Sequence, residues 1–184
     1  MTNGLAGIVL AGGGARRLGG VDKPMLEVGG MPLLHRAVAA LRAANPVVVV
    51  GPRRGGLPGV RWTREDPPGA GPVAALAAGL ALVHTDLVAV LAADLRGITP
   101  ATVDRLRGAL TAAEGADGAV LVDDAAQRQW LIGVWRSAAL RRALPETTAG
   151  AALRVTLGSL SIVDVPAEPG EAADVDTPED LPST

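Results

Sequence analysis

The sequence contains no cysteine, no phenylalanine and no tyrosine, and only three tryptophans among 184 residues. Without cysteine the chain cannot form disulfides, bind a metal through thiolates or use a thiol nucleophile. The core must therefore be built mainly from aliphatic side chains. Because 48% of the residues are hydrophobic, we expect enough core for one domain, spanning residues 1–184.

The chain also has little excess charge and no long apolar run. Its formal net charge is −2, so the field of the whole chain does not attract nucleic acid or an anionic membrane. Glycine, proline and charged residues interrupt every apolar stretch before the roughly 20 residues that a membrane-spanning helix needs. Residues 1–9 lack the pattern of a signal peptide. We therefore expect a cytoplasmic protein that binds neither nucleic acid nor membrane.

Short apolar runs alternate with segments of helical periodicity. Strands are predicted at residues 5–11, 47–50, 60–63, 87–92, 117–122, 130–135 and 160–165, and helices at 31–44, 73–83, 100–113, 137–144 and 177–180. This alternation predicts an α/β fold of three layers, with a mostly parallel central sheet and helices on both faces. Ligands bind beyond the carboxyl ends of such strands, which selects the loop after Ala11, the segment after Val50, and Asp94.

The strongest motif follows the first predicted strand, where residues 10–23 read LAGGGARRLGGVDK. Consecutive glycines let backbone N–H groups approach a phosphate closely, and arginines can hold it by charge-assisted hydrogen bonds. Lys23 can neutralise a phosphoryl group at the reacting centre. The spacing matches neither the Rossmann fingerprint nor the Walker A loop. The structural alternative is a glycine turn followed by a solvated basic surface.

Together with Pro24-Met25-Leu26-Glu27, this motif closely resembles the signature of MobA-type molybdenum cofactor guanylyltransferases, within the wider family of MobA-like nucleotidyltransferases. The resemblance continues in family order at residues 65–66, 71–74, 93–94 and 174–181. It implies a Rossmann-like nucleotidyltransferase fold and the transfer of GMP from GTP to the terminal phosphate of molybdopterin or of the molybdenum cofactor. Pyrophosphate would be released and a guanine dinucleotide cofactor formed. The implied cofactor is Mg²⁺, and we expect a monomer or weak homo-oligomer, open to transient contacts with other proteins of the cofactor pathway.

The resemblance also implies roles for individual residues. Lys23, Arg17 and Asp94 are the implied catalytic residues, and Asp94 also holds the metal. The implied nucleotide-binding residues are Leu10, Ala11, Gly12, Gly13, Lys23, Gly51, Asp66, Gly71 and Asp94. Asp174 and Asp176 lie where relatives often carry Asn on the side facing the pterin, so we expect them on the substrate side.

Some of these residues have simpler structural interpretations. Asp66 precedes a proline and could start a turn, Asp94 could cap a loop, and Asp176 could cap the last helix. Gly51 offers only its backbone, where well-known relatives have a polar residue. For the pair Arg53 and Arg54, a solvated loop is favoured over a contact with substrate phosphate.

Three other functions stay open. Cytidylyltransferases of the same pathway tend to read Leu-Ala-Ala-Gly, whereas Leu10-Ala11-Gly12-Gly13 favours guanine. A sugar-1-phosphate nucleotidyltransferase shares the glycine loop and the lysine but usually needs a longer chain. A paralogue that binds GTP without turnover would fit the departures from the family pattern at Gly14 and Arg96.

Overall fold

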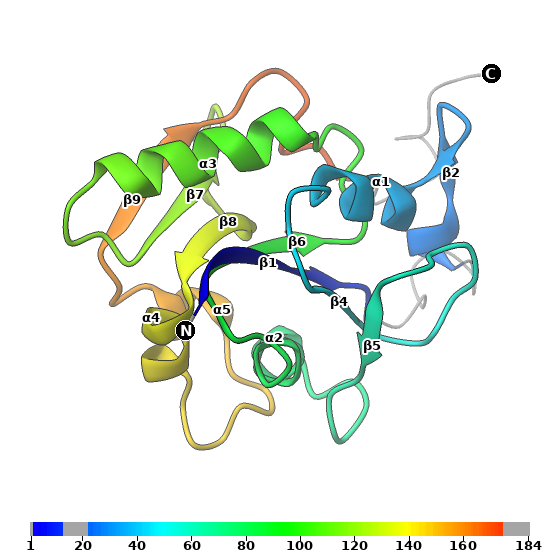
Figure 1. Cartoon of the computed structure of the whole chain (residues 1–184), viewed down its shortest axis with the longest axis horizontal. Coiled ribbons are helices and arrows are strands. Elements are labelled where there is room, and N and C mark those ends of the chain that lie inside the picture. The colour runs from blue at the N-terminus through cyan, green and yellow to red at the C-terminus, as the bar shows by residue number, and fades with distance from the viewer. Residues whose placement is uncertain (1, 13–21, 175–184) are drawn as a thin grey trace.

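The computed structural model describes residues 2–12 and 22–174. Their central feature is a seven-stranded sheet with the order β5-β4-β1-β6-β8-β7-β9 (Figure 1). All of its strands are parallel except β8, which is antiparallel to both of its neighbours. The strands are β1 (Thr2–Leu10), β4 (Val47–Val50), β5 (Arg61–Thr63), β6 (Thr85–Ala92), β7 (Gly118–Val122), β8 (Arg128–Arg136) and β9 (Ile162–Pro166). The mostly parallel sheet predicted from the sequence is confirmed.

Helices cover both faces of this sheet, as predicted. On one face lie α1 (Leu33–Ala40) and α3 (Pro100–Ala112), and on the other lie α2 (Pro72–Leu80), α4 (Ser137–Ala143) and α5 (Leu153–Leu157) (Figure 1). The N-terminus of α3 is capped as expected, because the Thr99 side chain accepts a hydrogen bond from the Thr102 N–H and Pro100 stands in the first turn.

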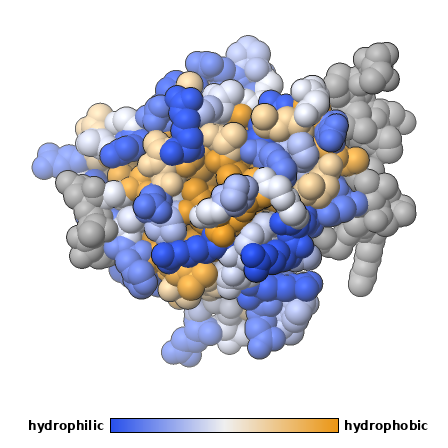
Figure 2. Space-filling view, turned by 45° about the vertical axis from the view of Figure 1, so that its right-hand side comes forward, coloured by the Kyte–Doolittle hydropathy of each residue, from blue (hydrophilic) through white to orange (hydrophobic). Residues whose placement is uncertain are grey.

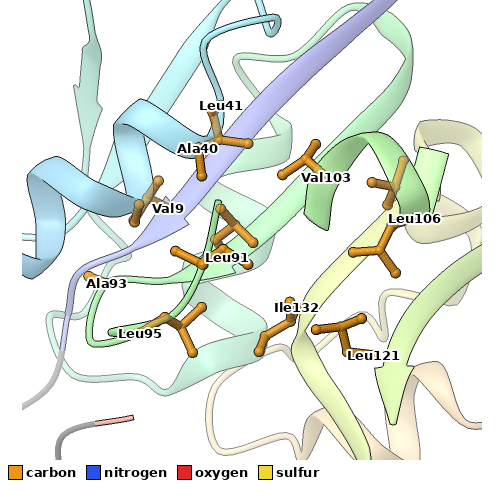
Figure 3. Close-up of a cluster of buried hydrophobic side chains, with 14 of the residues drawn as sticks. Val9, Ala40, Leu41, Leu91, Ala93, Leu95, Val103, Leu106, Leu121 and Ile132 are labelled. Carbon is orange, nitrogen blue, oxygen red and sulfur yellow. The ribbon is translucent and has the colours of Figure 1, made fainter. Parts of the chain in front are cut away.

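The core has two hydrophobic clusters, one on each face of the sheet. Figure 3 shows the first, in which Val9 and Leu91 of the sheet lie close to Leu41, Val103 and Leu106 of the helical layer. The second is packed under α2, α4 and α5 and contains Trp135, whose side chain is fully buried. Aliphatic residues thus form nearly all of the interior, as the lack of Phe and Tyr requires.

The predicted helix at residues 31–44 is wrong at both ends, because α1 covers only Leu33–Ala40. Met31 and Pro32 form strand β3, which pairs in antiparallel register with β2 (Glu27–Val28). Gly29 and Gly30 join the two strands with φ angles of +60° and +76°, which suits a tight hairpin turn that other residues rarely form. Pro32 therefore precedes the helix instead of lying in its first turn. A short 3₁₀ helix, η2 (Lys23–Met25), leads into this hairpin.

No helix formed by the described residues is both long and apolar enough to cross a membrane. On the face drawn in Figure 2, hydrophobic side chains gather near the middle and hydrophilic side chains surround them.

The chain before residue 175 returns to the loop between β6 and α3 and fixes it. Leu95 pairs with Asp174, and the Arg96 N–H donates to the Ala173 carbonyl at 3.0 Å. Gly97 allows a close approach, because a Cβ there would lie 2.0 Å from the Gly170 carbonyl oxygen. Contacts with residues 170–174 thus hold the loop that starts at Asp94 in place.

Glu171 anchors this returning segment. Its buried carboxylate accepts hydrogen bonds from the Thr102 hydroxyl at 2.5 Å, from the Arg105 guanidinium at 2.7 and 2.8 Å, and from the Glu168 N–H at 2.7 Å. Burial by itself would raise the pKa of Glu171, but these hydrogen bonds and the charge of Arg105 outweigh it and lower the pKa to about 2.

The lowered pKa of Glu171 makes stability depend on pH. The carboxylate stabilises the fold fully above its ordinary pKa of 4.5, and this contribution is lost as the pH falls towards about 2. We expect Glu171→Gln to reduce the free energy of unfolding at pH 7 by up to roughly 3 kcal/mol, with a smaller difference from wild type at pH 3. Urea unfolding at several pH values measures this. The matched control is Glu114→Gln, since Glu114 is exposed; an equal effect of Glu171→Gln at both pH values would contradict the assignment.

Candidate active site

Three parallel strands end at the same level at one edge of the sheet. Leu10, near the end of β1, lies opposite Val50 of β4 and Ala92 of β6. The Ala11 N–H donates to the Val50 carbonyl at 2.8 Å, and the Ala93 N–H donates to the Leu10 carbonyl at 3.1 Å. The structure thus brings together the three positions selected from the sequence, namely the loop after Ala11, the segment after Val50, and Asp94.

An ion pair between Lys23 and Asp94 lies at this edge. The distance from Lys23 Nζ to Asp94 Oδ2 is 2.8 Å, and the two side chains are 20% and 29% exposed. Lys23 begins η2, and Asp94 lies two residues beyond the end of β6. The pair places a compact positive charge beside a carboxylate that ligands can reach, which is an arrangement suited to a phosphate and a cation.

Arg54 contradicts the expectation of a solvated loop. Its guanidinium donates to both carboxylate oxygens of Asp22 at 2.7 Å and to the Ala11 carbonyl at 3.1 Å, and its side chain is only 10% exposed. Hydrogen bonds from Arg54 lower the pKa of Asp22 against the opposing effect of burial. Arg54 therefore joins residues on either side of the segment 13–21, and Asp22 is the direct neighbour of Lys23. The adjacent Arg53 is exposed, as expected.

Gly51 is required by a close approach of two backbone segments. Its φ angle is +148°, and a Cβ there would lie 2.6 Å from the Ala11 carbonyl oxygen and 3.0 Å from the Gly12 nitrogen. Its own N–H donates to the Thr63 carbonyl at 2.9 Å. Any side chain would push the end of β4 away from the start of the glycine motif. Gly51 thus has a structural reason to be glycine at a position where the resemblance led us to expect a polar residue.

At the end of β5, the buried acidic residue is Glu65, and its neighbour Asp66 is exposed. Glu65 Oε1 accepts a hydrogen bond from the Gly69 N–H at 2.9 Å. A Cβ on Gly12 would lie 3.6 Å from Oε1 and 3.9 Å from Oε2 of Glu65, so the carboxylate faces the glycine motif. Asp66 was the expected nucleotide-binding residue, and Glu65 was matched only as part of the motif at residues 65–66, although its place two residues after a predicted strand was a usable signal.

Other expected site residues occupy the surroundings of this edge. Gly71, with a φ angle of +101°, immediately precedes α2, and the adjacent Ala70 carbonyl accepts from the Gly150 N–H at 2.8 Å. Asp174 pairs with Leu95, one residue after Asp94, which places it beside the site. Gly13, Arg17 and Asp176 lie outside the described residues.

The carbonyls of Leu10 and Ala11 accept hydrogen bonds from Ala93 and Arg54, but each oxygen retains a second lone pair for a ligand.

A metal at this edge would depend on Asp94. Within residues 2–12 and 22–174, no three acidic or histidine side chains come together as a ligand set. Mg²⁺ needs fewer protein ligands than that, because it keeps several waters and takes the rest of its oxygens from one or two carboxylates and a bound phosphate. Since the ion pair with Lys23 uses Oδ2, a single partly exposed Asp94 fits a magnesium ion brought in with a phosphate.

Comparisons with known proteins agree with this geometry. A sequence profile of the MobA-like NTP transferase domain matches residues 7–163. A probable molybdenum cofactor guanylyltransferase of Natronomonas pharaonis is 32% identical, over 95% of this chain and 94% of its own length.

Two solved structures share the fold at lower sequence identity. Molybdopterin-guanine dinucleotide biosynthesis protein A of Archaeoglobus fulgidus superposes with a TM-score of 0.69 at 23% identity, covering 96% of this chain and 94% of that one. The 2-C-methyl-D-erythritol 4-phosphate cytidylyltransferase of Thermus thermophilus superposes with a TM-score of 0.71 at 22% identity, covering 95% and 94%. The sheet, the glycine motif and the extent of both sequence matches lead to one conclusion: the chain belongs to the family of MobA-like NTP transferases and is a nucleotidyltransferase.

Proposed function

We propose that this enzyme transfers GMP from GTP to the terminal phosphate of molybdopterin or of the molybdenum cofactor. The observation that carries the proposal is the Lys23–Asp94 ion pair, 2.8 Å long, beside the glycine motif at the edge where β1, β4 and β6 end. The Natronomonas relative, named a probable molybdenum cofactor guanylyltransferase, supports this choice of substrates.

The proposed reaction is an in-line substitution at the α-phosphorus of GTP. An oxygen of the terminal phosphate of the pterin forms a new P–O bond, the bond to the bridging α–β oxygen breaks, and pyrophosphate leaves with the electron pair. The nucleophile is already an anion, so no side chain has to remove a proton from it. Catalysis then depends on positioning and on neutralising the phosphate charges.

Lys23 and Asp94 divide this neutralisation between them. Lys23 is a point charge on a flexible stem, so it can move from Asp94 to a phosphate oxygen by a small rotation. Asp94 would hold Mg²⁺, which when bound supplies charge neutralisation on phosphate oxygens. Arg17, the third expected catalytic residue, would add a further positive charge to the triphosphate.

Arg54 is proposed to position Lys23. It contacts Asp22 through two short hydrogen bonds and Ala11 through a third, so it fixes the backbone from which the Lys23 side chain extends. Small displacements of a charged group at a reacting centre lower the rate strongly, because productive geometry is narrow.

Substitutions test the ion pair between Lys23 and Asp94. We expect Lys23→Ala and Asp94→Ala each to lower kcat by about a hundredfold or more with the fold intact, since each removes electrostatic stabilisation of the transition state. Pyrophosphate release and dinucleotide formation, with GTP and CTP in competition, measure the effect and identify the base. The matched control is Arg142→Ala, which breaks a 3.0 Å ion pair with Asp117 directly before the start of β7, at the opposite end of the parallel strands. Normal rates in both site variants would sink the assigned roles.

Substitutions of Arg54 test its positioning role. We expect Arg54→Ala to lower kcat/KM for GTP by about tenfold or more, and Arg54→Lys to restore little of it, because lysine keeps the charge but not the two-pronged contact with Asp22. Steady-state kinetics with Arg53→Ala as the exposed neighbouring control measure this.

A double-mutant cycle tests whether Arg54 acts through its contact with Asp22. Asp22→Asn should add little to the effect of Arg54→Ala, because both changes break the same contact. Fully additive effects of the two changes would show that Arg54 does not act through Asp22.

A further inference from the structure

Glu65 is a buried carboxylate whose hydrogen bonding is incomplete. The residue is 7% exposed, and Oε1 accepts the Gly69 N–H at 2.9 Å. Oε2 is inaccessible to solvent and has no hydrogen-bond partner among the residues that the structure describes. A carboxylate can accept about four hydrogen bonds, and leaving a buried acceptor unpaired costs free energy. The hydrogen bond to the Gly69 N–H alone therefore does not explain why a carboxylate is buried at residue 65.

The carboxylate lies at the candidate site. The last residue of β5, Thr63, is paired with Val50 at the end of β4, so Glu65 follows a fourth strand that ends at the same edge. Both of its oxygens lie within 4 Å of the place where a side chain of Gly12 would begin. Because residue 12 is glycine, no side chain at this position separates the glycine motif from the carboxylate. Lys23 and Asp94 stand at this same edge of the sheet, where the proposed triphosphate is held.

The base edge that fits two adjacent carboxylate oxygens is that of guanine. Guanine presents the N1–H and the 2-amino group side by side, and both are donors. Cytosine presents one amino donor beside two acceptors, N3 and O2, which a carboxylate oxygen would repel. Adenine offers one amino donor beside the acceptor N1. Because the carboxylate has only acceptors to offer, it selects the base with paired donors.

We propose that Glu65 reads the guanine base by accepting hydrogen bonds from its N1–H and its 2-amino group. This role rests on the proposed function, because it assumes that the nucleotide of the reaction binds at the same edge with its phosphates at Lys23 and Asp94. Oε2 gains the partners that it lacks, and Oε1 keeps its bond to Gly69 while accepting a second donor. Selection between GTP and CTP then depends on one side chain.

Equilibrium binding tests the role without any pterin acceptor. Dissociation constants for GTP, ITP and CTP, each with Mg²⁺, are measured by calorimetry on the full chain. ITP keeps N1–H but lacks the 2-amino group, so wild type should bind it roughly tenfold to a hundredfold more weakly than GTP. CTP should bind more weakly still. In Glu65→Gln the amide can turn a donor towards the base. We expect the affinity for GTP to fall by a similar factor, and the ratio of the affinities for GTP and ITP to fall towards one.

The ratio of the affinities for GTP and ITP distinguishes recognition of the base by Glu65 from a purely structural role. If Glu65 only holds the loop at Gly69, Glu65→Gln weakens the binding of GTP and of ITP equally and leaves the ratio of their affinities unchanged. That result overturns the proposal. Glu114→Gln, the same substitution on an exposed residue, is the matched control. If Glu65→Gln does not fold, wild type alone decides, because equal affinities for GTP and ITP, or tighter binding of CTP, also overturn it.

The experiments distinguish an error in the proposed reaction from an error in the proposed role of Glu65. Dinucleotide formation without a change of the GTP-to-ITP ratio in Glu65→Gln would leave the reaction standing and remove the role of Glu65. GTP binding with the expected discrimination but no dinucleotide product would do the reverse.

Discussion

The parallel pairing of β4, β1 and β6 is the constraint on which the site depends. Because Leu10 lies opposite both Val50 and Ala92, the three chain segments that follow these strands begin at one level and at one edge. Valine and other aliphatic residues buried on both faces hold this register, since a slip would move core residues to the wrong face. Gly51 then lets the end of β4 contact the Ala11 backbone directly. The side chains proposed to act in catalysis are thus carried on a rigid support.

Charges at this edge are arranged in two pairs of opposite sign. Asp22 and Arg54 form one pair, in which the Arg54 side chain is 10% exposed, and this pair holds the backbone. Lys23 and Asp94, whose side chains are 20% and 29% exposed, form the second pair, which is proposed to separate when the substrate binds. On the proposed reaction, the phosphates of the nucleotide would replace Asp94 as the partner of Lys23, and Asp94 would turn to the magnesium ion. A site of this kind keeps its charges compensated both before and after the substrate binds, which limits the cost of partly burying them.

Local sequence patterns predicted most of the fold and the positions that lie together at the candidate site. The valine run at residues 47–50, the capped start of α3, and the glycine motif after β1 each carry their signal within a few residues. The helix predicted at residues 31–44 starts too early because Met31 and Pro32 pair with β2, and the Gly29-Gly30 pair before them is a signal for such a tight hairpin.

The contacts that complete the site could not be predicted in this way. Arg54 meets Asp22 across 32 residues and Ala11 across 43, and only the folded sheet brings these positions together. The burial of Glu65 beside an exposed Asp66 depends likewise on where the chain turns after β5. Sequence patterns show which residue types follow a strand but not which of two neighbours faces inward. The resemblance to the family therefore predicted the region of the candidate site but not the contacts between its residues.

The central claim is that Lys23 and Asp94 act on one triphosphate. The most direct measurement is a crystal structure of the protein with Mg²⁺ and a GTP analogue that cannot be cleaved between the α- and β-phosphates. We expect a phosphate oxygen within hydrogen-bond distance of Lys23 Nζ and the metal coordinated by Asp94 on the same nucleotide. A nucleotide bound away from this edge, or contacting only one of these two residues, would contradict the claim.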